Sequence, residues 1–248
     1  VGEELVYRMK WGFVPIGKSR IKSSWVVENG RHILHIRYRA RTNSVFNRIY
    51  PMNDEAEVFI DPGSFRPMRF VFKKARRKTL CDETISFDYE RGMATVVSRC
   101  DKKERSFPLG RDSTDIVTFM YGMRRQPIQA GLSVSNRIMS TEGPLSLRLE
   151  VTEGEDVKLP VFGRVPCVKV VPELDLKSML VEKGQLTLWV SKDKRCVATR
   201  LTVKAPLANV HTTLCHIHGP GEDSWKDAMK TNRNEADCSV GGDVDKEL

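Results

Sequence analysis

Hydrophobic and polar residues alternate with a period of two along most of this chain. Near the start, Tyr7, Met9 and Trp11 alternate with Arg8 and Lys10. Because successive side chains of a β-strand point to opposite faces, this alternation predicts strands that bury one face. Similar short segments, separated by turn residues, lie near residues 20–27, 32–41, 57–60, 68–73, 83–88, 93–99, 145–151, 156–161, 165–171, 186–191, 197–203 and 207–217.

One segment has the period of a helix instead. Asp112 or Ser113 can cap it by accepting free backbone N–H groups, and Asp115 favours its first turn. We interpret its apolar stripe as core packing rather than as a cofactor site. The stripe consists of Ile116, Val117, Met120 and Tyr121.

These elements predict an all-β protein with one short helix. Short strands joined by turns favour a curved antiparallel meander that closes into a barrel or half-barrel. We assign residues 1–218 to a single β domain. Residues 219–248 are polar and are predicted to form a C-terminal tail, with a short helix around residues 223–230.

The Asn29-Gly30 pair predicts a tight hairpin, because a type I′ turn needs φ > 0 at both central residues. Its register brings Trp25 opposite Leu34 on one face and sets like charges opposite one another on the other face. Such charge pairs are destabilising, so this face is solvated, interleaved with acidic side chains, or matched to an anion. The basic residues of this face are Arg8, Lys10, Lys18, Arg20, Lys22, Arg37, Arg39 and Arg41.

The composition supports attraction to anions, since 41 Lys and Arg against 32 Asp and Glu give a net charge of +9. The apolar face of the same strands has two interpretations. In the first, this apolar face holds an acyl chain while the basic face contacts anionic headgroups. In the second, it is an ordinary closed core. Trp11 and Trp25 are its candidate ligand-binding residues. Its other members are Tyr7, Met9, Leu34, Ile36, Tyr38, Phe70 and Phe72.

Six cysteines allow a disulfide framework. The predicted hairpin of residues 83–88 and 93–99 brings Cys81 opposite Cys100, at a separation that suits a disulfide. The alternative for this pair is two buried, free thiols. The remaining pairs would be Cys167 with Cys196 and Cys215 with Cys238, but the sequence does not determine them.

We find no sequence motif for catalysis and expect no enzyme activity and no cofactor. A hydrolase would need a pocket that gathers Asp112, Asp115, His32 or His35. No nucleic-acid platform is predicted. The side chains of His211, Cys215, His216 and His218 are of types that bind zinc or copper. Strand alternation points His211 and Cys215 away from His216 and His218, so we expect no metal.

Four stretches of the chain carry a family resemblance through their order and spacing. They are Gly2-Glu3-Glu4-Leu5-Val6-Tyr7 with Trp11-Gly12 and Pro15-Ile16-Gly17; Phe107-Pro108 with Asp112-Ser113; Leu159-Pro160-Val161-Phe162-Gly163 with residues 165–172; and Leu186-Thr187-Leu188-Trp189-Val190-Ser191-Lys192-Asp193. Over residues 1–216 the chain resembles the bacterial domain-of-unknown-function 3108 family. The resemblance implies an exported protein of the Gram-negative envelope with a strongly curved antiparallel sheet. It carries over no functional residues.

Together these observations predict an exported protein, periplasmic or associated with the outer membrane, whose leader has been removed before Val1. We expect non-catalytic binding of an anionic or amphiphilic, lipid-like ligand or of an envelope partner, with contact to a membrane surface. The alternative is a structural scaffold that contacts another envelope protein. The sequence leaves the ligand and the oligomeric state open.

Overall fold

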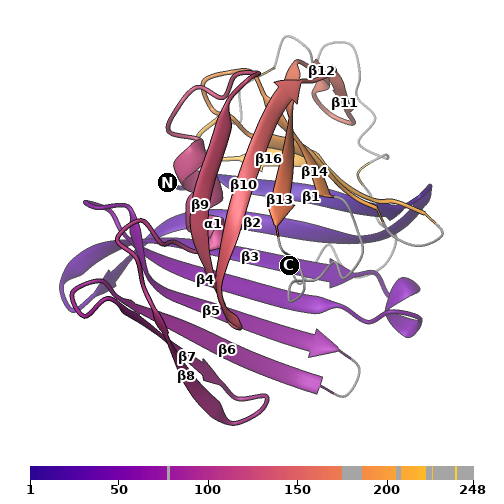
Figure 1. Ribbon diagram of the computed structural model, residues 1–248. Helices are drawn as coiled ribbons and strands as arrows, with labels where there is room; N and C mark the ends of the chain where they lie inside the picture. Colours follow the sequence, from indigo (N-terminus) through magenta and orange to yellow (C-terminus); the bar gives the residue numbers. More distant parts are fainter. Residues whose placement is uncertain (77–78, 175–185, 205–207, 222–224, 226–237, 239–248) are drawn as a thin grey trace.

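The structure is a computed structural model that describes residues 1–76, 79–174, 186–204, 208–221, 225 and 238 (Figure 1). Strands dominate it, as the alternation predicts. The elements are β1 (Glu4–Trp11), β2 (Val14–Glu28), β3 (Arg31–Thr42), the 3-10 helix η1 (Phe46–Arg48), β4 (Asn53–Asp61), β5 (Arg66–Arg76), β6 (Thr79–Asp88), β7 (Met93–Ser98), β8 (Lys103–Pro108), α1 (Ile116–Met123), β9 (Ser133–Ser140), β10 (Gly143–Glu153), β11 (Val157–Leu159), β12 (Gly163–Val165), β13 (Cys167–Leu174), β14 (Leu186–Ser191), β15 (Ala198–Val203) and β16 (Val210–His218).

A 14-stranded antiparallel sheet makes up most of the molecule. Its order is β8-β7-β6-β5-β4-β3-β2-β1-β16-β15-β14-β13-β10-β9, and β11 and β12 form a separate two-stranded ribbon. The sheet curls so that β9 and β10 face β2 to β5 across the interior (Figure 1). Because β8 and β9 are the two ends of the order and do not pair, the sheet is an open half-barrel, which is one of the two predicted alternatives.

The two terminal strands, β8 and β9, are missing from the sequence prediction. β8 reads Lys-Glu-Arg-Ser-Phe-Pro and β9 reads Ser-Val-Ser-Asn-Arg-Ile-Met-Ser. An edge strand pairs on one side only and tolerates charged and polar residues, which protect it from pairing with other chains. The weak apolar signal of both strands therefore follows from their place at the edge of the sheet.

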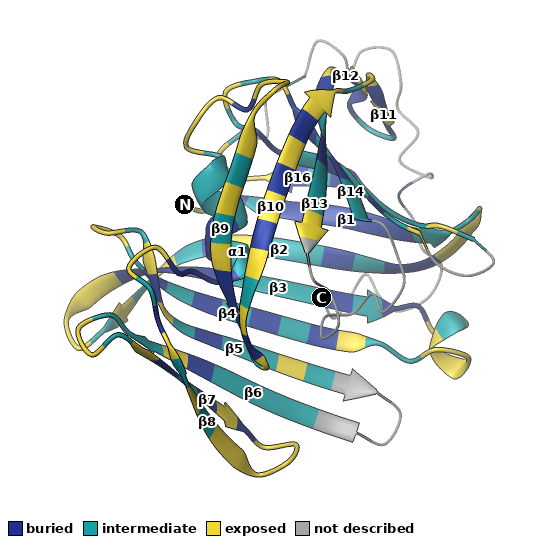
Figure 2. Cartoon of the chain, viewed as in Figure 1, coloured by how far each residue is buried: buried dark blue, intermediate teal, exposed yellow. Residues whose placement is uncertain are grey.

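The core fills the concave side of the sheet. Buried and exposed positions alternate along the strands (Figure 2), and Ile36 and Val58 on the inner face are fully buried. Phe119 of α1 packs in the same cluster as Leu147 of β10. The apolar face is thus largely a closed core covered by α1, β9 and β10. Trp25 differs, since it is 51% exposed at the far end of β2.

Asp115 caps α1. Its carboxylate accepts hydrogen bonds from the backbone N–H groups of Val117 (2.8 Å) and Thr118 (3.0 Å) and from the Thr118 hydroxyl. The predicted caps Asp112 and Ser113 are wrong, because the helix begins at Ile116 and the Ser113 hydroxyl accepts from a loop amide instead. Burial raises the pKa of Asp115. Among the described residues, no helix has the length and hydrophobicity needed to cross a bilayer.

The predicted pair Cys81–Cys100 is confirmed, and of the two pairs that the sequence left open only Cys215–Cys238 is formed. Cys81 and Cys100 form a disulfide, with Cα atoms 4.9 Å apart, at the end of the β6–β7 hairpin. The β6–β7 register is the predicted one. The pairing of Cys167 with Cys196 is not formed, and both remain buried, free thiols. Burial raises the pKa of the Cys167 thiol, which lowers its reactivity.

Two described residues of the predicted tail are attached to the β domain. Cys238 forms a disulfide with Cys215 of β16, with Cα atoms 5.9 Å apart. Trp225 packs edge-on against Phe162, with ring centroids 5.4 Å apart, and lies 4.4 Å from the Arg195 guanidinium. The helix predicted around residues 223–230 lies outside the described residues, apart from Trp225.

Candidate functional site

The hairpin of β2 and β3 forms the predicted basic face. Asn29 and Gly30 have positive φ angles of 52° and 74°. The register is the predicted one throughout the hairpin. It sets Lys22 opposite Arg37, Arg20 opposite Arg39 and Lys18 opposite Arg41 on the outer face, away from the core.

The neighbouring strands add acidic side chains to this face. Across β3 and β4, Arg39 lies opposite Glu55 and Arg37 lies opposite Glu57. On the other side, β1 brings Glu4 opposite Lys22. The sequence left three possibilities for this face: solvation, interleaving with acidic side chains, or an anion. In the middle of the face the structure has the second, because acidic side chains of β1 and β4 lie among the basic ones.

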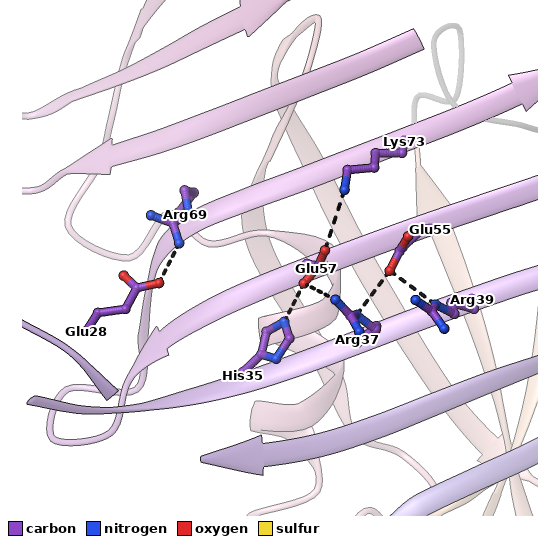
Figure 3. A network of polar contacts seen from close by, with 8 residues as sticks. All are labelled: Glu28, His35, Arg37, Arg39, Glu55, Glu57, Arg69 and Lys73. Carbon is purple, nitrogen blue, oxygen red and sulfur yellow. Dashed lines mark hydrogen bonds and ion pairs between the residues drawn. The ribbon is translucent and has the colours of Figure 1, made fainter. Parts of the chain in front are cut away.

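Glu57 is the centre of a network of charges on the outer face (Figure 3). Its carboxylate lies 2.8 Å from the His35 ring, 3.0 Å from Arg37 and 3.9 Å from Lys73. Arg37 also lies 3.0 Å from Glu55. Burial alone would raise the pKa of Glu57, but the charges and hydrogen bonds of Arg37 and His35 outweigh it and lower that pKa.

Trp11 and Trp25 do not join the basic residues. Both lie on the inner face of the sheet, at opposite ends. The Trp11 indole donates to the Ala208 carbonyl (3.0 Å) and packs edge-on against Phe46. Trp25 packs edge-on against His32. The candidate residues therefore do not form one pocket, and anion binding by the basic face stays a prediction.

The residues of the predicted alternative sites lie apart. Asp115 is buried as a helix cap and His35 is held by Glu57 on the outer face. On β16, a bulge at Cys215 changes the predicted alternation. His211, His216 and His218 pair with Lys10, Val6 and Glu4, so all three share the outer face while Cys215 is taken up by its disulfide.

A groove beside α1 is a further candidate that the sequence did not predict. It has a volume of about 350 Å³, at the lower end of the roughly 300–1,000 Å³ typical of small-molecule sites. It lies between the β4–β5 turn, α1 and the edge strand β9. Its walls include the apolar residues Phe65, Pro67, Phe119, Met123, Ile128 and Val134.

Arginines surround this apolar groove. Arg66 and Arg111 line it and are exposed, with Asp112 at the same edge. The Arg66 guanidinium lies 4.9 Å from the centroid of the Tyr89 ring, and that of Arg125 lies 4.8 Å from the centroid of the Phe65 ring. These cation–π contacts hold positive charge beside the apolar walls.

Polar contacts fix the wall that carries α1. The Tyr89 hydroxyl donates to the Ser113 carbonyl (2.7 Å). Thr114 exchanges backbone hydrogen bonds with the edge of β9, through Arg137 and Met139. At the other end of α1, Arg124 donates two hydrogen bonds to the carboxylate of Glu3. The groove is therefore a preformed feature of the fold.

A family model described as a protein of unknown function, DUF3108, matches residues 6–212. The chain belongs to the DUF3108 family. The family match covers both the β1–β8 part of the sheet and the strands that face it, so it spans the groove and the basic face. No curated protein matches this chain.

The structure also resembles a solved one. The crystal structure of a β-barrel-like protein of the domain of unknown function DUF1849 from Brucella abortus superposes with a TM-score of 0.57. It is 13% identical in sequence, and the match covers 87% of this chain and 96% of that chain. At this identity the likeness supports the β-barrel-like fold alone.

Proposed function

We propose that this DUF3108 protein is a non-catalytic binding protein for an anionic amphiphile, a small molecule with one short acyl or aromatic part and an acidic head. The observation that carries the proposal is the groove beside α1, which combines apolar walls with arginines at its edge. Ligand sites are commonly concave and mainly apolar, with a few polar groups that orient the ligand.

The size of the groove limits the ligand. The inner face of the sheet is packed by α1, β9 and β10, so a carrier that encloses a whole phospholipid is not supported. A volume of about 350 Å³ suits a single short chain or ring system. In this proposal Arg111 or Arg66 contacts the acidic head, because a guanidinium forms strong, charge-assisted hydrogen bonds to carboxylate and phosphate.

We also propose that the protein works outside the cytoplasm, in the periplasm or at the outer membrane. The two disulfides support this location, since disulfides persist in oxidising compartments and are rare in reducing ones. A role in the cell envelope would then give access to amphiphilic anions.

Gly122 offers a direct test of the groove. A Cβ atom at Gly122 would lie 3.6 Å from Cε1 of Phe65, an ordinary van der Waals contact. Gly122→Ala should therefore fold and bind normally, with higher helix propensity. In Gly122→Leu the longer side chain extends toward Phe65 and occupies the groove. We expect at least a tenfold loss of affinity for dodecanoate or 8-anilinonaphthalene-1-sulfonate, measured by fluorescence or calorimetry.

A second variant tests the acidic head. Arg111→Gln should weaken binding of both anions about fivefold to tenfold and leave an uncharged dodecanol unaffected, because only the charge-assisted contact is lost. Arg91→Gln, on the β6–β7 turn and 85% exposed in its side chain, is the matched control. Equal binding by wild type and Gly122→Leu, with both proteins folded, would refute the groove as the site.

A further inference from the structure

A carboxylate lies beside the Cys81–Cys100 disulfide, at the open end of the β6–β7 hairpin. Cys81, Glu83 and Ile85 occupy alternate positions of β6, so their side chains share the concave face of the sheet. Ile85 is fully buried in the core, whereas Cys81 and Glu83 are half-buried. The two sulfur atoms and a carboxylate oxygen of Glu83 all lie within 4.8 Å of one another. The group shares no residue with the groove beside α1.

These three side chains carry ligand types that zinc binds. Zinc takes thiolate sulfur at about 2.3 Å and carboxylate oxygen at about 2.0–2.2 Å, in a tetrahedral arrangement. Those bond lengths place two ligand atoms of one site roughly 3.4–3.8 Å apart. The sulfur atoms, once reduced, therefore need only small rotations of their side chains to converge with the Glu83 oxygen on one cation. Soft thiolates also favour zinc over magnesium or calcium.

The surroundings of the group suit this set of ligands. In the part of the chain that the structure describes, the Glu83 carboxylate has no hydrogen bond or ion pair. Lys74 of β5 lies opposite Cys81, and its ammonium group lies 5.2 Å from the centroid of the Phe72 ring, which is opposite Glu83. A neighbouring lysine favours the thiolate, the form of cysteine that binds metals. It also offsets part of the negative charge of two thiolates and one carboxylate.

Exposure distinguishes the two disulfides of the chain. Cys100 is exposed and Cys81 is half-buried, whereas Cys215 and Cys238 are only 1% and 3% exposed. Thiol–disulfide exchange requires that a thiolate reach one sulfur atom of the bond, and exposed disulfides are the labile ones. We therefore expect a reductant in solution to open Cys81–Cys100 well before Cys215–Cys238.

We propose that Cys81, Cys100 and Glu83 bind zinc once a dithiol has reduced the disulfide. One thiolate of the dithiol attacks the Cys100 sulfur, and Cys81 leaves as a thiolate. The second thiolate of the dithiol then displaces Cys100, so the dithiol becomes a disulfide and the protein gains two electrons and two protons. Zinc binding releases those two protons from the thiols.

The exposed side of the group leaves room for a fourth ligand. Zinc sites with three protein ligands hold water or a further ligand in the fourth position, and Cys100 places that position at the surface. The same hairpin end is thus linked by a disulfide in the oxidised protein and by zinc in the reduced one. The inference goes beyond the groove and does not rest on the binding of an amphiphile.

The test is a metal titration of the full chain in both redox states. The protein is reduced under native conditions with dithiothreitol, freed of it by gel filtration under nitrogen, and titrated with cobalt(II) and then zinc. Reduced wild type should bind one cobalt ion with a thiolate-to-cobalt charge-transfer band, and zinc should displace it. The oxidised protein contains the free thiols Cys167 and Cys196 and should show no such band.

Two variants test the carboxylate. Glu83→Gln should weaken zinc binding by the reduced protein at least about tenfold, because it removes one of three ligands. Glu90→Gln changes an exposed glutamate in the turn of the same hairpin and is the matched control. It should bind zinc like wild type. Both replacements keep the cysteines, and circular dichroism should show unchanged folding in either redox state.

Alkylation with peptide mapping tests which disulfide opens. Dithiothreitol should expose Cys81 and Cys100 to the label before Cys215 and Cys238, and zinc should then protect Cys81 and Cys100. Absence of cobalt or zinc binding by the reduced protein would overturn the proposal. Equal affinity in Glu83→Gln and wild type would also overturn it, since the carboxylate would then be no ligand, and so would reduction of both disulfides at the same rate.

Discussion

We expect the ion pair of Glu3 and Arg124 to hold the C-terminal end of α1 against the sheet. Arg124 donates hydrogen bonds of 2.7 and 2.8 Å to the two carboxylate oxygens and one of 3.0 Å to the Arg195 carbonyl. The side chains are only 10% exposed for Glu3 and 19% for Arg124. The neighbouring carboxylate, Glu3, raises the pKa of Arg124 despite the opposing effect of burial, so this side chain stays charged.

Removing one partner leaves the other charge buried without compensation. A fully buried pair loses roughly 3–5 kcal/mol in this way, whereas an exposed pair contributes roughly 0–1 kcal/mol. Because some exposure remains, we expect Arg124→Met to lower the free energy of unfolding by about 3 kcal/mol. This corresponds to a fall in Tm of about 6–12 °C for a chain of this size. Glu3→Gln should cost about 2 kcal/mol.

The assay is urea denaturation followed by tryptophan fluorescence, with the disulfides kept oxidised. The double variant should cost about 3 kcal/mol instead of the additive value of about 5, since the two residues share one interaction. Arg125→Met, which alters the adjacent exposed arginine, is the control and should cost less than about 1 kcal/mol. An additive double variant, or a loss in Arg124→Met no greater than in Arg125→Met, would refute the reasoning.

Three further predictions concern the pH dependence of stability, the free thiols and the Cys81–Cys100 disulfide. The pKa of Glu57 is lowered from its ordinary value of 4.5. Its contribution to stability is therefore present above that value and is lost as pH falls through the lower pKa of the folded state. Glu57→Gln should flatten the acid limb of a curve of unfolding free energy against pH, and an unchanged limb would contradict this. Alkylation under denaturing, non-reducing conditions should label Cys167 and Cys196 alone, and label on more than two cysteines would contradict the disulfide assignment. Cys81→Ser should lower the free energy of unfolding by about 3 kcal/mol, as expected for a disulfide that closes a loop of this length.

Local features of this protein could be predicted from its sequence because neighbours in the chain determine them. The turn at Asn29 and Gly30 sets the register of β2 and β3, and a second tight turn sets that of β6 and β7. The Cys81–Cys100 disulfide follows from that second register. The family resemblance could also be recognised, since its motifs follow one another along the chain from β1 to the end of β14.

Longer connections left other features open. Ten residues separate β3 from β4, so no turn geometry predicts that Glu55 and Glu57 face Arg39 and Arg37. The edge strands β8 and β9 pair on one side and carry a weak apolar pattern. The bulge in β16 shifts His216 to the face of His211, because one inserted residue reverses the alternation that follows it.

The sequence alone determined the class of the fold, a curved antiparallel sheet with one helix, because alternation and turns are properties of short segments. The groove was decided only by the tertiary structure. It takes its walls from the β4–β5 turn, α1 and β9. Such a site depends on how distant segments pack against one another, and that packing follows from the closure of the whole sheet around its core.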